Sequence, residues 1–321
     1  MAFMKPEGLT VKLRKDPFDL LFQALTALAA LAVLALVAGF FLALYREASL
    51  SLGHFGPWRF LTTANWDPVA EAFGALTSLY GTVVVTTLAL LMAVPVALGI
   101  AIFVTEVAPG PLRGLIGGAI ELLAAIPSII YGMWGLFTLA PIMAEHVEPA
   151  LQQSLGRVPG LGLLFQGTPM GIDVLTASVI LSIMIIPFTA SVARDAFNLT
   201  PAVVKESAYA LGATKWEVLW QVVLPFSRAG VLGGVVLSLG RALGETMAVA
   251  FVLGNVHQVK ASLLEAATTI TVTLANEFTE ADTDLYLSSL FALALVLFVL
   301  SFLVLAVAKV FLLRAERRQA R

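Results

Sequence analysis

Six long apolar segments, separated by shorter polar ones, dominate the chain. They cover residues 18–45, 78–107, 115–143, 171–197, 228–254 and 285–312. A helix needs roughly 20 apolar residues to cross the hydrocarbon core of a bilayer, and each segment is long enough. The runs are continuous rather than alternating, so they predict helices and not the strands of a barrel. The expected fold class is therefore all-α: a polytopic membrane helical bundle with six transmembrane helices.

Two of these segments depart from a plain transmembrane pattern. The first is longer than a bilayer requires, so we expect it to tilt or to project from the membrane. The third is interrupted by Glu121 and Pro127, and its first part is expected to lie at the membrane interface or to line the bundle interior. Because Pro95, Pro127 and Pro187 each remove a helical hydrogen bond within an apolar segment, the sequence predicts an irregular bundle that can surround a cavity.

Lysine and arginine are distributed unequally between the two sets of connecting segments. One set, which includes both ends of the chain, holds Lys5, Lys12, Arg14, Lys15, Arg113, Arg194, Lys205, Lys215, Arg228, Lys309, Arg314, Arg317, Arg318 and Arg321. The opposite set holds only Arg46, Arg59, Arg157 and Lys260. Positively charged loops favour the cytoplasm, so both termini are expected to be cytoplasmic. An even number of spans is consistent with this, because it places the two termini on the same side.

This orientation divides the rest of the chain. Residues 1–17 form a cytoplasmic N-terminal segment and residues 313–321 a basic cytoplasmic tail, and the expected permease-like core spans 78–312. The external loops are 46–77, 144–170 and 255–284. The last of them is acidic, which is typical of a solvated loop or of a docking surface for an external partner.

Composition supports a membrane protein and excludes several other classes. The chain is 59% hydrophobic and 12% charged, whereas a soluble domain is about a quarter charged. A net charge of −2 gives no reason to expect nucleic-acid binding. There is no cysteine, the three histidines lack metal-ligand spacing, and no phosphate-binding loop for ATP is present. We therefore expect no cofactor, no metal and no catalytic site in this chain.

The connecting segment 198–227 has the capping residues of two short helices. Thr200 is the expected N-cap of the first helix, with Pro201 at its first position. Gly212 follows where a residue with positive φ ends a helix. Thr214 and Glu217 then form a capping box for a second helix, which is expected to stop near 224–225. On spacing alone, such a pair is equally consistent with an amphipathic linker on the membrane surface.

This helix pair resembles the cytoplasmic coupling loop of the permease subunits of ABC importers. The matching residues, all at the family spacing, are Glu206, Ala208, Gly212, Leu224 and Pro225. Ser207 and Val222 replace the alanine and isoleucine of the family pattern. The resemblance implies that this loop forms a coupling helix that fits a cleft on a separate ATP-binding subunit, and that the fold is like that of a type I ABC importer permease.

Two charged residues lie inside the fifth apolar segment. Arg241 is 13 residues beyond Arg228, a helical rise of about 20 Å, which predicts a position near the bilayer middle. Glu245 is four residues further on, on the same face of a continuous helix. Ionisable residues at this depth are functional candidates by default. The alternative is a self-neutralising ion pair that only fixes helix packing, which glycines at 230, 234, 240 and 244 would also favour.

The segments 240–249 and 126–135 are similar to those of phosphate-specific ABC permeases, in particular of the PstC type. The resemblance covers most of 78–312. It implies a phosphate importer of the bacterial inner membrane, whose partners are a PstA-type permease, a PstB-type ATPase dimer and a periplasmic phosphate-binding protein. The sister PstA-type subunit carries a related segment and is the alternative assignment.

The two charged residues suit phosphate chemically. Arginine offers a fixed fork of donors for phosphate oxygens. Glutamate can accept a hydrogen bond from an oxyanion that carries a proton, as phosphate does near neutral pH and sulfate does not. We therefore expect Arg241 to line the anion path, while Glu245 holds Arg241 in the empty state and accepts the phosphate O–H in transit. A permease for sulfate or molybdate, a secondary transporter or channel, and a membrane sensor or scaffold are the other possible functions.

Overall fold

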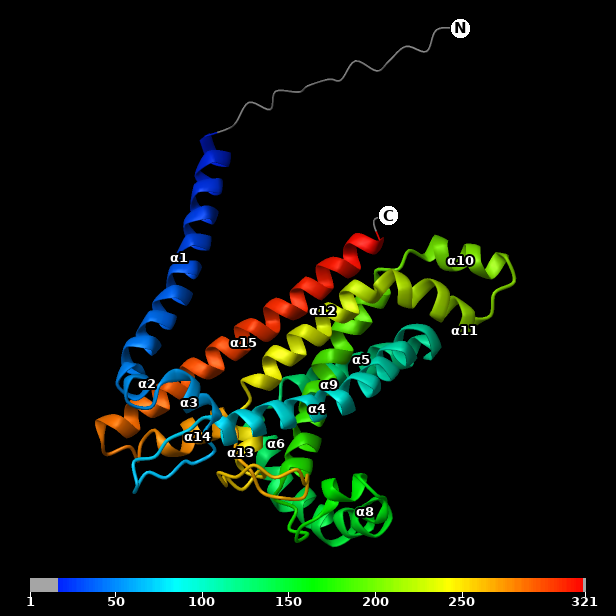
Figure 1. The fold of residues 1–321 in the computed structure, drawn as a ribbon. Helices are drawn as coiled ribbons and strands as arrows, with labels where there is room; N and C mark the ends of the chain where they lie inside the picture. Colours follow the sequence, from blue (N-terminus) through cyan, green and yellow to red (C-terminus); the bar gives the residue numbers. More distant parts are fainter. Residues whose placement is uncertain (1–16, 320–321) are drawn as a thin grey trace.

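The computed structural model describes residues 17–319, and these residues are almost entirely helical (Figure 1). Of the expected N-terminal segment 1–17, only Pro17 belongs to the described residues, and 320–321 of the expected tail lie outside them. In the described part, six helices are long and apolar enough to cross a membrane, which confirms the predicted number. They are Phe18–Glu47, Leu76–Val107, Ser128–Arg157, Val174–Asn198, Lys215–Leu243 and Asp284–Arg314.

Several of these spans contain more than one helical element. The α-helices are α1 (Pro17–Glu47), α2 (Ser49–Phe55), α3 (Pro57–Thr62), α4 (Leu76–Ile102), α5 (Gly110–Ala124), α6 (Ser128–Trp134), α7 (Ala140–Ile142), α8 (Glu148–Ser154), α9 (Val174–Asn198), α10 (Ala202–Ala210), α11 (Lys215–Val218), α12 (Leu224–Leu243), α13 (Met247–Ala250), α14 (Ile270–Glu277) and α15 (Asp284–Gln319). Wider π-helical turns occur at Phe103–Val107, Gly135–Leu139, Met143–Val147 and Leu219–Val223, and narrower 3-10 turns at Leu155–Arg157 and Leu161–Phe165.

Helices α4, α9 and α12 form the centre of the bundle through small residues. The α9–α12 contact places Gly230 against Ala196 and Gly234 against Val192, so that any side chain at either glycine would meet its neighbour. Thr189 and Ser238 are joined by a hydrogen bond of 2.7 Å in the same contact. Lipid gives no hydrophobic drive for helix association, so close packing and interhelical hydrogen bonds hold these helices together.

The expected third span, 115–143, is wrong in its position. Residues 110–124 form the separate helix α5, and the span itself begins only at Ser128 and runs to Arg157. Pro127 has extended backbone (ψ 138°) and precedes α6. Proline lacks an amide hydrogen and disfavours helical geometry in the residue before it, so it separates the two helices rather than kinking one. Pro95 and Pro187, by contrast, lie inside α4 and α9 as predicted.

The expected fifth span, 228–254, is also wrong at both ends. Helix starts at Lys215, continues without a stop through the π turn 219–223 into α12, and ends at Leu243. Pro225 is accommodated because the wider turn before it bonds the amide of Leu224 to the carbonyl of Leu219. At the other end, residues 244–246 leave the helix and a new short helix, α13, follows.

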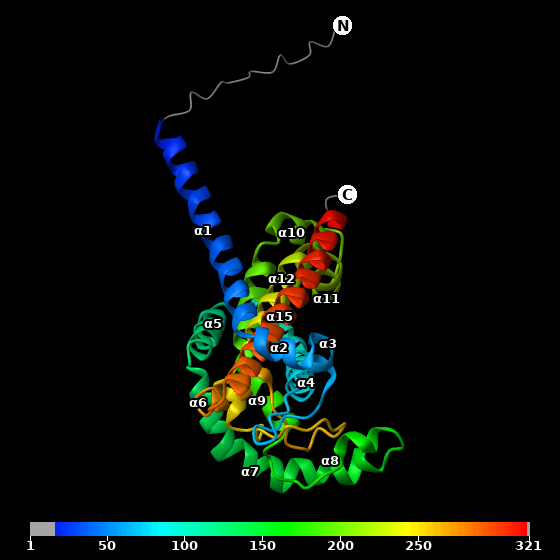
Figure 2. The same cartoon turned by 60° about the vertical axis from the view of Figure 1, so that its left-hand side comes forward.

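The two ends of the bundle are different in character. In both views, α10, α11, the C-terminal end of α15 and the N-terminal end of α1 lie at one end, and α2, α3, α14 and α8 lie toward the other (Figures 1 and 2). The first span projects away from the other helices, and none of its most apolar stretch is buried (Figure 2). The first and last of the described residues, 17 and 319, thus lie at the same end of the bundle as α10 and α11 (Figure 1).

The carboxylate of Glu277 connects three segments at the end of the bundle away from α10 and α11. Glu277, at the end of α14, accepts hydrogen bonds from Trp66 Nε1 at 2.6 Å and from Tyr286 Oη at 2.8 Å. His257 Nε2 lies 2.8 Å from the other carboxylate oxygen, and the His257 ring stacks on Trp66. Burial would raise the pKa of Glu277, but these hydrogen bonds outweigh burial and hold the pKa below its ordinary value. Three separate segments are thereby joined by one side chain.

Two further carboxyl groups are buried together where α8 approaches the start of α9. Glu148 is fully buried, and Asp173 caps α9 by accepting a hydrogen bond of 2.8 Å from the amide of Thr176. Burial raises the pKa of Asp173 to about 7; the Thr176 amide opposes this shift, and Glu148 adds to it. Burial and the neighbouring Glu148 therefore favour the protonated form of Asp173 up to about pH 7.

The buried pair predicts that stability falls as pH rises. Between about pH 4 and about pH 7 the folded chain binds a proton at Asp173 that the unfolded chain has released, so ionisation favours unfolding. We expect Asp173→Asn, which keeps the helix cap, to flatten the fall of the unfolding midpoint in this window. The measurement is thermal unfolding in detergent against pH, with Asp19→Asn at an exposed site as the control. Equal slopes in wild type and Asp173→Asn would contradict the raised pKa of Asp173.

Candidate functional site

The turn between α10 and α11 has the geometry expected of a tight helix–helix connection. Gly212 has φ +91°, a value that favours glycine, which confirms its predicted role. The amide of Gly212 donates to the carbonyl of Tyr209 at 2.9 Å, and that of Ala213 to Ala208 at 3.1 Å. These two hydrogen bonds form a Schellman motif, which ends α10 and reverses the chain.

The start of α11 is fixed by the predicted capping box. Thr214 Oγ1 accepts from the amide of Glu217 at 3.3 Å, and Glu217 Oε2 accepts from the amide of Thr214 at 2.7 Å. The expected start of α10 is wrong, however. Pro201, with ψ 134°, is the cap and Ala202 the first helical residue, while Thr200 is buried and does not cap the helix.

The α10–α11 pair presents apolar side chains to its surroundings. Leu211 is 90% exposed at the tip, and Trp216 of α11 and Trp220 of the following π turn are exposed with their rings in edge contact. Glu206, Ala208 and Gly212 lie in α10 and the turn, with Glu206 exposed. Exposed apolar residues grouped on a polar element are typical of a surface that binds another protein.

The same helix pair is firmly attached to the bundle on its other face. Val218, Leu219 and Val223 are buried in a cluster with Ala101 of α4 and Phe197 of α9. In addition, Lys205 of α10 forms a 2.5 Å ion pair with Glu106, in the π turn that follows α4. The pair is therefore a rigid projection rather than a loose loop.

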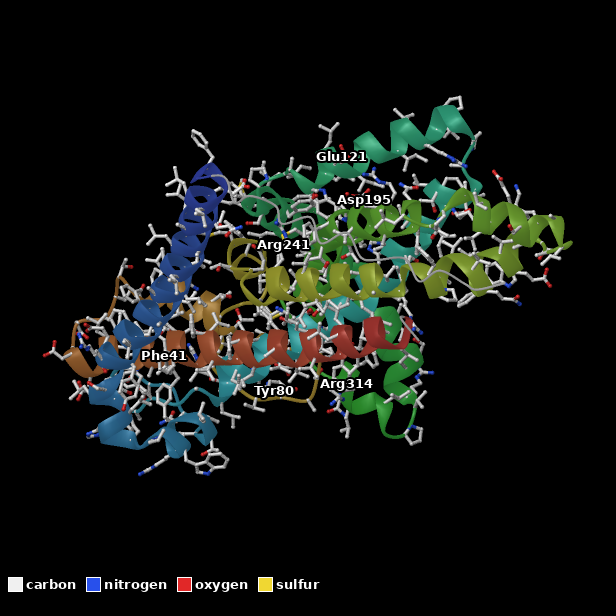
Figure 3. All side chains as sticks on the ribbon, turned by 90° about the horizontal axis from the view of Figure 1, so that it is seen from above. Phe41, Tyr80, Glu121, Asp195, Arg241 and Arg314 are labelled. Carbon is white, nitrogen blue, oxygen red and sulfur yellow. The ribbon has the colours of Figure 1, made fainter. Side chains whose placement is uncertain are left out.

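Arg241 lies in the last turn of α12, beside the break that follows this helix (Figure 3). Its side chain is exposed, and the guanidinium group has no hydrogen-bond acceptor or ion-pair partner in the part of the chain that the structure describes. It lies close enough to Tyr131 for the two side chains to interact electrostatically. All its donors therefore remain available to a ligand.

Glu245 is not on the same helical face as Arg241, because α12 ends at Leu243. Its Oε1 accepts a hydrogen bond of 3.1 Å from the amide of Ala248, so the side chain caps α13. The expected ion pair with Arg241 is not formed. The reason is local: glycine at 244 weakens the helix, and a carboxylate placed before α13 satisfies one of the amides that the break exposes.

The two segments singled out in the sequence, 126–135 and 240–249, meet at this break. Tyr131 is buried and donates from its hydroxyl to the carbonyl of Leu123 in α5. Gly132 packs directly on α13, since a Cβ there would lie 2.9 Å from the carbonyl oxygen of Met247 and 3.1 Å from Cα of Ala248. Helix α6 thus supports the break from one side.

A cluster of buried hydroxyl groups, which the sequence analysis missed, supports the break from the other side. Thr271 Oγ1 donates to the carbonyl of Glu245 at 2.7 Å. Thr273 exchanges hydrogen bonds with Thr268 and with Ser78 of α4, each at 3.0 Å. The signal in the sequence was the run of threonines at 268–273, which is unusual beside apolar residues.

The structure does not bring the two sets of expected site residues together. Glu206, Ala208 and Gly212 lie at one end of the bundle, and Arg241 and Glu245 lie near the opposite end of the span Lys215–Leu243. Leu224 and Pro225 lie inside this span, which has 29 residues and a length of about 43 Å. One helix therefore connects the exposed turn to the arginine.

Comparison with known families and sequences gives consistent matches. Residues 93–317 match the family described as "Binding-protein-dependent transport system inner membrane component". A phosphate transport system permease protein PstC from Mesorhizobium japonicum is 53% identical over 300 residues, covering 94% of this chain and 91% of the relative. A protein of the same description from Pasteurella multocida is 47% identical over the full length of both chains.

Solved structures show the same fold at low sequence identity. A chain of the MetNI methionine ABC transporter, in an inward-facing conformation, matches with a TM-score of 0.56 and 15% identity, over 78% of this chain and 99% of the other. A chain of a bacterial ABC transporter that imports alginate matches with a TM-score of 0.56 and 17% identity, over 92% and 96%.

The contact between α6 and α13 predicts that Gly132→Ala destabilises the chain. The added Cβ would lie 2.7 Å from the ring of Phe251 and 2.9 Å from a backbone oxygen, and overpacking of this kind costs about 1–3 kcal/mol. We expect a lower midpoint of thermal unfolding in detergent. Gly118→Ala, where a Cβ meets nothing within 4 Å, is the control and should not lower it. A wild-type midpoint for Gly132→Ala would show that the break tolerates looser packing.

Proposed function

This chain belongs to the family of binding-protein-dependent transport system inner membrane components, as the permease subunit of a phosphate ABC transporter of the PstC type, and we propose that Arg241 and Glu245 form its anion contact. The observation that carries the proposal is the guanidinium of Arg241, which has no ion-pair partner among residues 17–319. It lies at one end of a helix whose other end bears the coupling turn. ATP hydrolysis belongs to a partner chain.

Arg241 supplies the attraction for the anion. A guanidinium in the last turn of a membrane-spanning helix is costly unless it faces protein or a water-filled path, and Arg241 has no ion-pair partner among residues 17–319. Its planar fork of donors fits two oxygens of a phosphate group. An approaching anion therefore both binds to the arginine and compensates its charge.

Glu245 supplies the discrimination between oxyanions. One carboxylate oxygen is held by the amide of Ala248, which fixes the orientation of the group, and Oε2 has no hydrogen-bond donor within the described range 17–319. A protonated phosphate can donate its O–H to that oxygen. An anion without a proton, such as sulfate or molybdate, would instead meet an unpaired acceptor and a like charge, which a polar site of this kind rejects strongly.

The coupling turn delivers the mechanical step. Leu211, Trp216 and Trp220 form the docking surface for the ATPase, with Glu206, Ala208 and Gly212 shaping the helix and turn that present it. Because helix runs unbroken from Lys215 to Leu243, displacement of the turn moves Arg241 as well. Leu224 and Pro225 lie where the wider π turn joins α11 to α12, and this turn fixes the direction of α12 relative to α11.

Partners and orientation follow from the same assignment. Membership of the family implies a binding protein and an ATPase as partners. We propose that these are a periplasmic phosphate-binding protein and a PstB-type ATPase dimer, and that a PstA-type permease forms the other half of the path. The end of the bundle with α10, α11 and both termini is cytoplasmic, and the core spans 78–312 with its coupling loop at 198–227.

The anion contact predicts a specific loss of transport. In the assembled importer, reconstituted in proteoliposomes with its binding protein, Arg241→Gln is expected to lower ATP-driven phosphate transport about tenfold or more, since a charged hydrogen bond contributes about 1.5–3 kcal/mol. Glu245→Gln is expected to slow phosphate transport and to increase inhibition by sulfate. Arg46→Gln, at an exposed site outside the core, is the control. Wild-type rates in both variants would reduce the two residues to packing.

The coupling turn predicts a separation of hydrolysis from transport. Gly212→Val places a β-branched residue at φ +91°, which is strained, and should distort the turn without affecting the spans. We expect the purified complex to hydrolyse ATP without matching phosphate transport. Gly212→Asn is the matched control, because asparagine adopts positive φ more readily. Transport in step with hydrolysis in Gly212→Val would contradict a coupling role for the turn.

A further inference from the structure

A cavity of about 270 Å³, lined in part by polar side chains, lies near the end of the bundle that carries the coupling turn. Its walls come from the π turn after α4, the first turns of α5 and the last turns of α9. They are formed by Val104, Thr105, Arg113, Gly114, Arg194 and Asn198. Two guanidinium groups, an amide and a hydroxyl thus face one small space, and neither the anion contact nor the coupling surface uses them.

The guanidinium of Arg113 is held through one of its three nitrogens, Nε. Its Nε donates to the carbonyl of Ala108 at 2.8 Å. The two terminal nitrogens have no acceptor among residues 17–319, the range that the structure describes. A guanidinium held in this way is preorganised to donate into the cavity, because little side-chain freedom is lost when an anion binds.

Arg194 is held more tightly and is already charge-compensated. Its Nη2 lies 3.1 Å from Glu121 and 3.2 Å from Asp195, and the side chain is largely buried. Gly117 leaves room for the remaining nitrogen, since a Cβ there would lie 2.8 Å from Nη1. Together with Arg113, this set of four charged groups is neutral. An anion bound here is attracted by directed donors rather than by net charge, so binding is weak enough to permit release.

The cavity lies on the coupling side of Arg241. In the α9–α12 contact, Ala196 opposes Gly230 and Val192 opposes Gly234, so Arg194 is level with residues near 232. Arg241 is nine residues further along α12, a rise of about 14 Å. Viewed from above, Glu121, Asp195 and Arg241 follow one another from α5 through α9 to the end of α12 (Figure 3).

The walls of the cavity are linked directly to the coupling helices. Thr105 precedes Glu106, which forms the 2.5 Å ion pair with Lys205 of α10. Asn198 is the last residue of α9, and α10 begins at Ala202. Movement of the coupling turn therefore acts on two of the three segments that enclose the space.

We infer that this arginine cavity is a second anion site, which binds the phosphate group of a ligand on the cytoplasmic side of Arg241. The inference rests on the proposed function, because the direction of transport makes this the side on which the anion is released. Inorganic phosphate leaving the path and the headgroup of an anionic lipid share the chemistry that these donors recognise.

The test uses the complete importer in proteoliposomes that contain binding protein and phosphate, with ATP and the ATPase face outside. Phosphate added outside is expected to slow transport by occupying the site from the release side. Arg113→Gln should raise the phosphate concentration needed for this inhibition about tenfold, the loss expected for one charged hydrogen bond, without changing the KM for phosphate on the binding-protein side. A parallel series varies the phosphatidylglycerol content of the vesicles.

A second variant tests the cavity without removing a charge. Gly114 lines the cavity and a Cβ there meets nothing within 4 Å, so Gly114→Leu fills the space. Gly118→Leu, equally open but outside the cavity, is the matched control. Both cavity variants should reduce inhibition by outside phosphate, whereas the control should not.

The outcomes separate the ligands and the two proposals. Weaker inhibition by outside phosphate in both cavity variants supports inorganic phosphate as the occupant. Unchanged inhibition with a lost response to phosphatidylglycerol supports a lipid headgroup. No change in either series overturns the second site even when the wild type transports phosphate. Absence of ATP-driven phosphate transport by the wild type counts instead against the function itself.

Discussion

Inside hydrocarbon each unpaired backbone group is expensive, so every interruption of a transmembrane helix in this chain requires a local replacement for the lost hydrogen bonds. At the α5–α6 break, the hydroxyl of Tyr131 supplies one for the carbonyl of Leu123. At the α12–α13 break, Thr271 bonds the carbonyl of Glu245, and the Glu245 carboxylate bonds the amide of Ala248. The Glu245 carboxylate thus satisfies a backbone amide left unpaired by the break and also faces the proposed anion path.

The coupling turn and Arg241 are connected by a single continuous helix, because no break occurs between them. The π turn at 219–223 absorbs Pro225 without ending the helix, and the span remains continuous from Lys215 to Leu243. On the opposite face, Lys205 ties α10 to the end of α4. The α10–α11 pair is therefore joined to the bundle by the continuous helix 215–243 and by the ion pair of Lys205 with Glu106. These two attachments prevent it from rotating independently of the bundle.

The sequence predicted the features that depend on composition and on local capping. Hydropathy gave the number of spans, and Gly212, Thr214 and Glu217 gave the turn and the capping box. Pro127 indicated an interruption of the third segment, but not that residues 110–124 form a helix separate from the span. The break at 244–246 was not predicted, because apolar content is the same in a continuous and in a broken helix. The buried threonines at 268–273 were missed for a related reason: their partners lie in α4, far away in the sequence.

The N-terminal span has a different relation to the rest of the chain. Helices α1 and α2 attach mainly to α15, where Ser288 donates to the carbonyl of Glu47 and Ser289 donates to Ser51, and none of the most apolar stretch of α1 is buried. The family match begins only at residue 93. Because the contacts of this span are mainly with α15, substitutions in its exposed part leave the packing of α4, α9 and α12 undisturbed.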